Sequence, residues 1–230
     1  MNIPEEHPYF QLTSKQQRRF KYKLALSALI LVLLSGILSF LSHLYFLPFL
    51  VLPFLLSVIA PFFDVPPMVR SGKLRYYSLL VLAEAPRKGR IQLHGGTLFD
   101  YYFMFKDERE HAPFTRFTLY HYLNGLVNLI ETHQDQEGGL ILQGTTYMVG
   151  ARTLEKIGFR RTSVPVFQRL ILLFNYFNLT LAYSLVKGKL QQGQLSFPNF
   201  TQIYAFEASI EELAERREYI IALRDRIGKE

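Results

Sequence analysis

His94 and Asp100 are the side chains best suited to acid–base chemistry, and they bracket the segment His94-Gly95-Gly96-Thr97-Leu98-Phe99-Asp100. A histidine that is oriented by a carboxylate can act as a general base. On a straight strand, residues six apart lie about 20 Å from each other, so these two side chains meet only if the chain bends at the two glycines. The alternative is a structural histidine whose ring nitrogens are hydrogen-bonded within the fold.

The sequence contains no motif for metal or nucleotide chemistry. The absence of cysteine excludes zinc–thiolate sites, iron–sulfur clusters and cysteine nucleophiles. No H-E-x-x-H, P-loop or G-x-G-x-x-G occurs, and the six histidines lack metal-ligand spacing. We therefore predict no metal and no cofactor. The basic residues form no aromatic-and-basic stripe, so nucleic acid is not a predicted partner either.

A long apolar tract precedes the elements that would position these residues. The chain has 230 residues, of which 49% are hydrophobic and 20% charged, and its net charge is +7. Residues 24–63 contain no Asp, Glu, Lys or Arg. One membrane pass needs about 20 residues, so the tract predicts two passes, over about 22–43 and 46–63, with a turn at Ser42-His43-Leu44-Tyr45. A buried helical hairpin in a soluble protein is the alternative.

Prolines interrupt the second pass and mark its end. Pro48, Pro53 and Pro61 remove helical hydrogen bonds, which predicts a kinked or partly re-entrant helix. Asp64-Val65-Pro66-Pro67 is expected to end the membrane unit, because proline disfavours helical geometry before it. The predicted organisation is a basic N-terminal segment (1–23), a transmembrane hairpin (24–63) and an α+β domain (64–230).

Basic residues flank both ends of the apolar tract. Lysine and arginine near membrane ends tend to stay in the cytoplasm, and the predicted turn has neither. We therefore expect a multi-pass protein of the inner (cell) membrane with both termini cytoplasmic, and we expect the flanking residues to bind anionic lipid headgroups. These residues are Lys15, Arg18, Arg19, Lys21, Lys23, Arg70, Lys73 and Arg75.

The domain shows an α+β pattern. Aromatic and β-branched runs separated by Gly or Pro predict strands, and apolar residues at helical spacing predict helices. The C-terminal helix is expected to begin at a capping box formed by Ser209 and Glu212, and Glu212 is expected to pair with Arg216. The expected elements are a hairpin over 74–83 and 91–93, a strand over 98–105, a helix over 113–133, a strand over 140–149, a helix over 151–157 and a helix over 209–228.

Residues 164–186 allow two interpretations. The segment is apolar almost all round, which is typical of a third membrane pass, but Asn175 and Asn178 would be costly in hydrocarbon without a partner. We expect instead one helix that packs on the domain or lies at the membrane surface, with arginines at one end and lysines at the other.

Leu154-Glu155-Lys156-Ile157-Gly158-Phe159 resembles a signature of the GNAT family of N-acetyltransferases. In that family a strand, a long helix and a second strand precede the short helix that carries the signature. The resemblance spans about residues 98–159 and implies a GNAT-like fold. Two features depart from the family. Lys106–Ala112 replaces the glycine-containing loop that binds the acyl-CoA phosphates, and it holds three acidic residues. Leu154 occupies the place of the tyrosine that serves as general acid.

Two functions follow from these observations. The first is a membrane-surface module whose cytoplasmic domain binds lipid or assembles with a membrane-protein partner. The alternative, which the resemblance implies, is an acyltransferase that uses acyl-CoA and modifies a lipid-linked or membrane-protein amine. In that alternative His94 or Asp100 is the base, in a cleft near Thr145 and Thr146.

Overall fold

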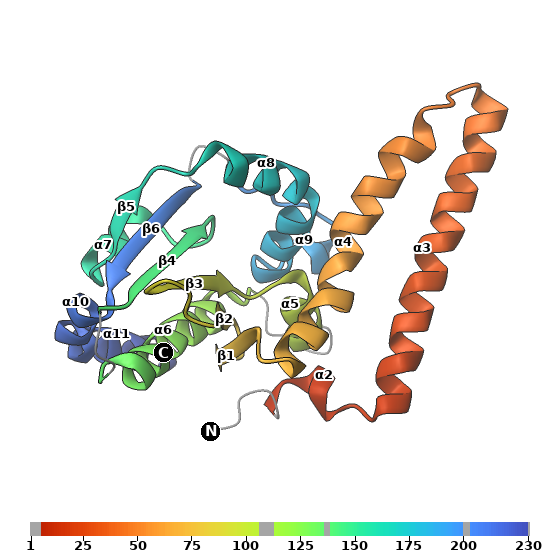
Figure 1. Cartoon of the computed structure of the whole chain (residues 1–230). Coiled ribbons are helices and arrows are strands. Elements are labelled where there is room, and N and C mark those ends of the chain that lie inside the picture. Colours follow the sequence, from red (N-terminus) through yellow and green to blue (C-terminus); the bar gives the residue numbers. More distant parts are fainter. Residues whose placement is uncertain (1–5, 106–112, 136–138, 200–202, 230) are drawn as a thin grey trace.

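The computed structural model describes residues 6–105, 113–135, 139–199 and 203–229. Two long helices, α3 (Ser14–Ser42) and α4 (Leu47–Arg70), stand beside an α+β domain (Figure 1). The short helix α2 (Pro8–Gln11) precedes α3 and packs against the domain near the base of the pair. The expected fold class is confirmed at this level: two apolar N-terminal helices followed by a mixed sheet with helices.

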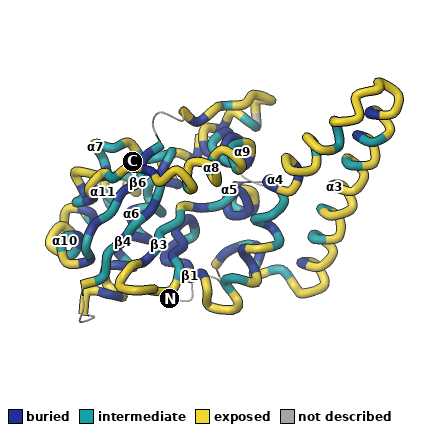
Figure 2. Tube along the Cα trace, turned by 45° about the horizontal axis from the view of Figure 1, so that its top comes forward, coloured by how far each residue is buried: buried dark blue, intermediate teal, exposed yellow. Residues whose placement is uncertain are grey.

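Helices α3 and α4 are the two candidate membrane spans of the described chain by length and composition. Thr13 and Gln16 form a capping box at the start of α3, and α3 ends at His43, whose φ of 59° turns the chain at the expected place. Most side chains along the upper part of both helices are exposed in the protein alone (Figure 2). Such a surface is stable where lipid covers it.

The second pass is not interrupted at its prolines, so the partly re-entrant alternative is wrong, whereas the expected kink stays a prediction. The helix also continues beyond its expected end. Helix α4 is one continuous helix with Pro53, Pro61, Pro66 and Pro67 in its interior, and it reaches Arg70 instead of ending at Asp64-Val65-Pro66-Pro67. Beyond the apolar tract it enters the domain, where Phe62 and Val65 join a buried cluster. Tertiary contacts therefore hold the last turns of α4 despite the missing amide donors.

One six-stranded sheet forms the centre of the domain, in the order β1-β2-β3-β4-β6-β5. Only β3 and β4 are parallel, and the other neighbouring pairs are antiparallel. The expected hairpin is confirmed as β2 and β3, and β1 adds a further antiparallel strand. The strands are β1 (Leu74–Ser78), β2 (Val81–Glu84), β3 (Arg90–Gly95), β4 (Ile141–Thr146), β5 (Arg160–Thr162) and β6 (Tyr204–Ser209).

The expected strand over 98–105 is wrong, because these residues form helix α5 (Leu98–Phe105). Thr97 precedes the helix, and both its backbone N–H and its hydroxyl donate to Asp100 Oδ2, at 2.6 and 2.8 Å. This is the reciprocal half of a capping box. Helix α5 lies between α2, α4 and α9 (Tyr176–Val186), so buried residues occur all round it. A helix buried on every side has the same apolar run as a buried strand.

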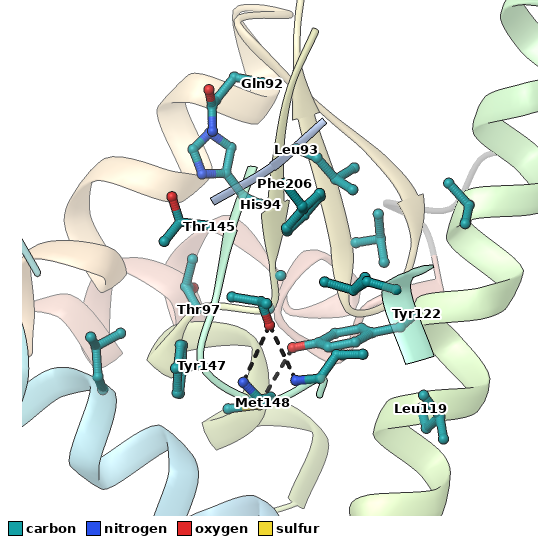
Figure 3. Close-up of a pocket in the computed structure, with 18 of the residues that line it drawn as sticks. Gln92, Leu93, His94, Thr97, Leu119, Tyr122, Thr145, Tyr147, Met148 and Phe206 are labelled. Atoms are coloured by element: carbon teal, nitrogen blue, oxygen red, sulfur yellow. Dashed lines mark hydrogen bonds between the residues drawn. The ribbon is translucent and has the colours of Figure 1, made fainter. Parts of the chain in front are cut away.

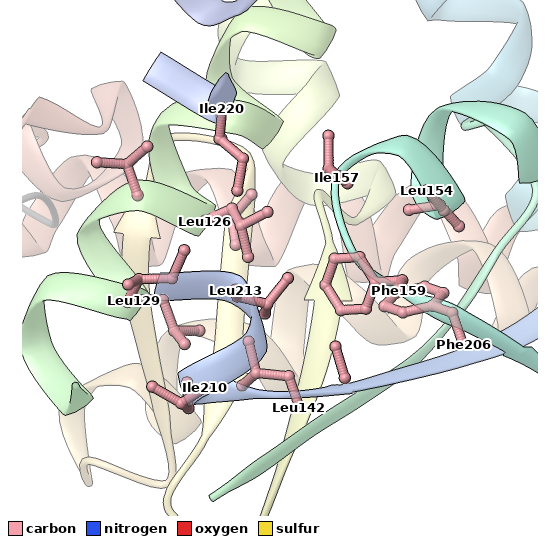
Figure 4. Packing of buried hydrophobic residues seen from close by; sticks show 14 of the residues in the cluster. Leu126, Leu129, Leu142, Leu154, Ile157, Phe159, Phe206, Ile210, Leu213 and Ile220 are labelled. Carbon is pink, nitrogen blue, oxygen red and sulfur yellow. The ribbon is translucent and has the colours of Figure 1, made fainter. Parts of the chain in front are cut away.

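Two hydrophobic clusters occupy opposite faces of the sheet. The first packs the sheet against α6 (Thr115–His133), α7 (Ala151–Lys156), α10 (Ile210–Glu215) and α11 (Arg217–Lys229); Leu129, Leu142 and Leu213 are fully buried in it (Figure 4). The second packs α2, α4, α5 and α9 against the face of β1 and β2. The expected helices over 113–133 and 151–157 and the expected strand over 140–149 correspond to α6, α7 and β4.

The C-terminal region follows the expected capping but differs in pairing. The Ser209–Glu212 capping box is present and starts α10. The helix is interrupted at Arg216, and α11 continues from Arg217. Glu212 forms its ion pair with Arg160 rather than with Arg216, whose guanidinium donates to the Lys156 carbonyl. The expected pair within this helix is therefore wrong, because partners from other elements are closer.

Residues 164–186 form two helices instead of one. Helix α8 (Val166–Phe174) and α9 meet at Asn175 with a bend of 67°. Taken together, the two helices are long and apolar enough for a membrane segment, either a broken span or a re-entrant loop. Helix α9 packs against α4 and α5, whereas α8 has no buried residue. The expectation of one helix is therefore wrong, the expected packing on the domain holds for α9, and the alternative position at the membrane surface stays a prediction for α8.

We predict that the stability of the domain falls between pH 6.5 and pH 4 because of His121 on α6. Burial lowers the pKa of His121 from 6.5 to about 4, and its Nδ1 has no hydrogen-bond partner within the described chain. Unfolding below pH 6.5 therefore takes up a proton that the folded state does not bind, and the free energy of unfolding declines by up to about 3 kcal/mol at pH 4. Chemical denaturation of the detergent-solubilised protein at several pH values measures this loss.

The variant His121→Gln should show a flatter pH dependence than the wild type over this interval. His43→Gln, at the exposed turn between α3 and α4, is the matched control and should leave the pH dependence unchanged. Equal slopes for the wild type and His121→Gln would contradict the prediction.

Candidate functional site

Strands β3 and β4 diverge at their carboxyl ends, and this gap is the centre of the candidate site. Their parallel pairing runs from Arg90 and Ile141 to Leu93 and Gly144 and then stops. Beyond that point β3 stays paired with β2 as far as Gly95, and β4 stays paired with β6 as far as Thr146. The facing edges of 94–95 and 145–146 are therefore left without a ladder between them, and their backbone polar groups can bind a ligand.

Gly144 marks the point at which the strands part. A Cβ atom there would lie 2.6 Å from Cζ of Phe206 and 3.0 Å from the carbonyl oxygen of Leu93. Only glycine allows the Phe206 ring to lie over β4 so closely while β3 is still paired with it. Ring packing and strand pairing thus meet at one residue, just before the gap opens.

A pocket of about 360 Å³ passes through this gap. Its lining includes Leu93 and Phe206, which belong to the face covered by α6, and Gln92, His94 and Thr145, which belong to the opposite face (Figure 3). Successive strand residues point to opposite faces, so one pocket can take side chains from both only where the sheet is open. The lining is mostly apolar with a few polar groups, as in small-molecule sites.

Helix α4, a candidate membrane span, and the α8–α9 pair complete the wall of the pocket. Pro61 of α4 lines it, together with Gln168 and Leu172 of α8 and with Asn175, Asn178 and Leu179 at and after the bend. The pocket therefore lies between the open end of the sheet and the segments nearest the candidate spans.

His94 is paired with Glu84 rather than with Asp100. Nε2 of His94 lies 3.1 Å from Oε1 of Glu84, and both side chains are 40% exposed. Glu84 is on β2, where the hairpin register places Leu82 opposite His94. The histidine is thus oriented by a carboxylate at the rim of the pocket, and that carboxylate comes from the neighbouring strand.

Asp100 does not line the pocket, and the bend at the two glycines does not bring it to His94. The side chain is fully buried and accepts hydrogen bonds from the Tyr76 hydroxyl and from Thr97. Nε2 of His7 lies 3.4 Å away, outside hydrogen-bond geometry, and the His7 ring stacks on Phe99. Burial, with a further contribution from the Asp100 charge, raises the pKa of Tyr76 above its usual value. Asp100 therefore acts as a structural anchor for the turn after β3.

Thr145 and Thr146 both line the pocket, as do His94 and the two glycines after it. Thr145 points to the same face as His94, whereas the Thr146 hydroxyl accepts hydrogen bonds from the backbone N–H groups of Met148 and Val149, at 3.3 and 3.2 Å. Thr146 thus holds the loop after β4, and Thr145 lines the pocket from the same face as His94.

Three tyrosines place protonated hydroxyls at or behind the pocket. The hydroxyls of Tyr101 and Tyr122 are 2.6 Å apart, and both contact the sulfur of Met148. Burial raises the pKa of Tyr122 to about 12 and raises those of Tyr101 and Tyr147 well above their usual value. These phenols stay neutral at physiological pH, so they act as hydrogen-bond donors and not as bases.

The flanking basic residues gather at one end of the α3–α4 pair. Lys15, Arg18, Arg19, Lys21 and Lys23 lie in the first turns of α3, and Arg70 ends α4. Arg70 donates to the side chain of Gln17, so the two ends are joined. Lys73 and Arg75 follow directly, and the Arg75 guanidinium lies over the Tyr77 ring. The basic residues at the start of α3 and at the end of α4 therefore lie at the same end of the helix pair.

Several site residues were not identified from the sequence. Glu84, Tyr122 and Pro61 belong to three different elements, and only the register of the β2–β3 hairpin could have pointed to Glu84. Lys106–Ala112, which replaces the phosphate loop of the resembled family, lies outside the described residues. Within the described part of the chain, no group of three or more His, Cys, Asp or Glu residues could hold a metal ion.

Comparisons with protein-family models, with curated proteins and with solved structures find no match to this chain.

Proposed function

We propose that this chain is an integral membrane protein with both termini in the cytoplasm, and that its domain binds an amphipathic ligand at the membrane surface. The observation that carries this proposal is the gap between β3 and β4, through which an apolar pocket passes beside membrane helix α4. Unpaired strand edges suit a polar, extended part of a ligand, and the apolar lining suits a hydrocarbon part. The basic residues at the domain end of α3 and α4 favour binding of anionic lipid headgroups there.

Ligand binding is tested by the thermal stability of the full-length protein in neutral detergent. The probes are phosphatidylglycerol, acetyl-CoA and a long-chain acyl-CoA. A ligand at a hundredfold excess over its Kd stabilises the folded state by about 2.7 kcal/mol, and each kcal/mol raises the Tm of a chain of this size by about 2 to 4 °C. We expect such a rise with at least one of the three probes.

The variant Thr145→Trp should abolish this rise, because an indole ring at position 145 fills the pocket between the strands. Thr132→Trp, at an exposed position on α6, is the matched control and should respond as the wild type does. An absence of stabilisation by all three probes, or an equal rise in both variants, would contradict ligand binding in this pocket.

Acyl transfer is the second candidate function, and the His94–Glu84 pair at the rim of the gap favours it. Under this proposal the histidine accepts the proton of an amine that attacks the thioester carbonyl, a C–N bond forms, the C–S bond breaks and the thiolate leaves. The observed order is β3, α5, α6, β4, α7, so helix α5 stands where the GNAT resemblance implies the first strand, and only α6, β4 and α7 follow the implied order. Release of free CoA thiol in the presence of lipid or peptide amines is the measurement. If acyl-CoA binds but no thiol is released, acyl transfer is contradicted and ligand binding is not.

A further inference from the structure

The α8–α9 bend lies beside the middle of α4. The rings of Phe177 and Phe54 meet edge to face, with centroids 4.8 Å apart, and Nδ2 of Asn178 donates to the Ser57 carbonyl at 2.9 Å. Phe54 is nine residues from Phe63, the end of the uncharged tract, which corresponds to about 13 Å along the helix. If α4 spans a bilayer, the bend is at the depth of the hydrocarbon.

The bond between Asn178 and Ser57 has a specific cause in α4. Residue 61 is proline and has no N–H, so the carbonyl of Ser57, four residues before it, lacks its helical donor. In hydrocarbon an unpaired carbonyl costs several kcal/mol, and neighbouring helices satisfy such groups in membrane proteins. The Asn178 amide is the donor here, and it is buried in the same contact. Asn178, whose amide would be costly in lipid, is thus paired with the Ser57 carbonyl, which has no donor within α4.

One face of helix α8 lines the pocket, and the opposite face is exposed. Gln168 and Leu172, one helical turn apart, are half-buried and line the pocket. The outer face consists only of apolar side chains that are each more than half exposed: Val166, Phe167, Leu170, Leu173 and Phe174. Such a face needs a cover, and the exposed apolar surface of α4 lies directly beyond the bend.

The charges around the α8–α9 pair suit a bilayer surface. Lys187 and Lys189 follow the pair, and Arg169 is the only charged residue inside it. Arg160 and Arg161, which precede it on β5, are held within the domain instead, where they contact Glu212 and the Tyr204 ring. Arg169 is on the flank of α8 between its two faces, from which a long side chain can reach the headgroups. An apolar segment with basic residues at its end is typical of helices that lie in the interface.

We propose that the α8–α9 bend inserts into the leaflet nearest the domain, with the outer face of α8 against lipid acyl chains and its inner face roofing the pocket. The occupant of this surface is the bilayer itself. The inference goes beyond ligand binding in the pocket and does not depend on it.

The protein has no tryptophan, so a single introduced indole reports the environment of one position. The test variants are Phe167→Trp and Leu170→Trp on the outer face of α8. Leu50→Trp, on the exposed surface of α4, is the membrane reference, and Tyr219→Trp, exposed on α11, is the aqueous reference. Each full-length variant is reconstituted into phosphatidylcholine–phosphatidylglycerol vesicles, with and without phosphatidylcholine brominated in mid-chain, after a melting curve has shown that it is folded.

Bromine quenches indoles that contact the acyl chains. We expect at least a twofold loss of fluorescence for Phe167→Trp and Leu170→Trp, comparable with the loss for Leu50→Trp, and no loss for Tyr219→Trp. Quenching of Leu50→Trp without quenching of either α8 variant would overturn the proposal while leaving the membrane anchor in place. If Leu50→Trp is also unquenched, α4 is outside the bilayer and the proposal falls with it. Neither result depends on whether the pocket binds a ligand.

Discussion

Replacement of Asp100 by alanine is expected to destabilise the domain by about 3 to 5 kcal/mol, because it leaves three hydrogen-bond donors without an acceptor. Asp100 is fully buried, and its two oxygens accept hydrogen bonds from Tyr76 and from the N–H and hydroxyl of Thr97. Alanine leaves these donors buried without partners, and each unsatisfied group costs about 1 to 3 kcal/mol. Urea denaturation of the full-length protein in detergent measures the loss.

The matched control is Asp225→Ala, which removes an exposed carboxylate paired with Arg224. Exposed ion pairs contribute little, so its effect should stay below about 1 kcal/mol. Tyr76→Phe leaves the buried Oδ1 of Asp100 without its donor and should cost about 1 to 3 kcal/mol. A similar loss for Asp100→Ala and Asp225→Ala would show that the buried network does not anchor the turn.

Replacement of Gly125 by alanine is expected to destabilise the domain by about 1 to 3 kcal/mol, although alanine is the better helix former. Helix propensity alone favours alanine over glycine by about 0.5 to 1 kcal/mol. A Cβ atom at this position of α6 would lie 2.5 Å from Cβ of Val81 and 2.8 Å from Oγ of Ser78. The helix would have to move away from β1 and β2, and overpacking of this kind outweighs the propensity gain.

Gly36→Ala is the steric control for this substitution. Gly36 also occupies a helix interior, in α3, and no atom lies within 4 Å of the Cβ position. It should leave the stability unchanged or raise it slightly. Thermal melts of both variants in the same detergent decide between packing and propensity, and an increase in Tm for Gly125→Ala would show that α6 has room to adjust.

The two long apolar helices and the local signals that start and end helices could be predicted from the sequence. An uncharged tract of 40 residues has few structures available to it, and the two apolar helices follow. The Ser209–Glu212 capping box and the glycine after α7, with φ of 108° at Gly158, are local signals that the structure retains. These features depend on neighbours in the sequence, so a single sequence is enough.

Helix α5 shows where sequence patterns were insufficient. Its aromatic run favoured a strand, and periodicity cannot distinguish a short buried strand from a helix that is buried on all sides. The decisive signal was Thr97 followed three residues later by Asp100, which is a capping spacing and not a catalytic one. Asp100 was assigned to acid–base chemistry because His94 lies near it in the sequence. Its structural role depends on Tyr76, which is 24 residues away, and the sequence pattern does not show that contact.

The candidate site was only partly predictable for the same reason. His94, Thr145 and Thr146 do line one pocket, as the sequence suggested. The carboxylate that orients His94 comes from β2, and its identity depends on strand register. The gap itself depends on two strands each following a different partner, which requires the topology of the whole sheet.

Pro61 belongs to two environments, since it is part of a candidate membrane span and part of the pocket wall. A transmembrane helix accommodates a thinner or thicker bilayer by changing its tilt. The Asn178–Ser57 bond fixes α4 to α9 close to this point, so a tilt of α4 is transmitted to α9 instead of being absorbed by slippage between the helices. Pro61 of α4 and Asn178 of α9 both line the pocket, so a change in the tilt of α4 is expected to move two parts of the pocket wall together.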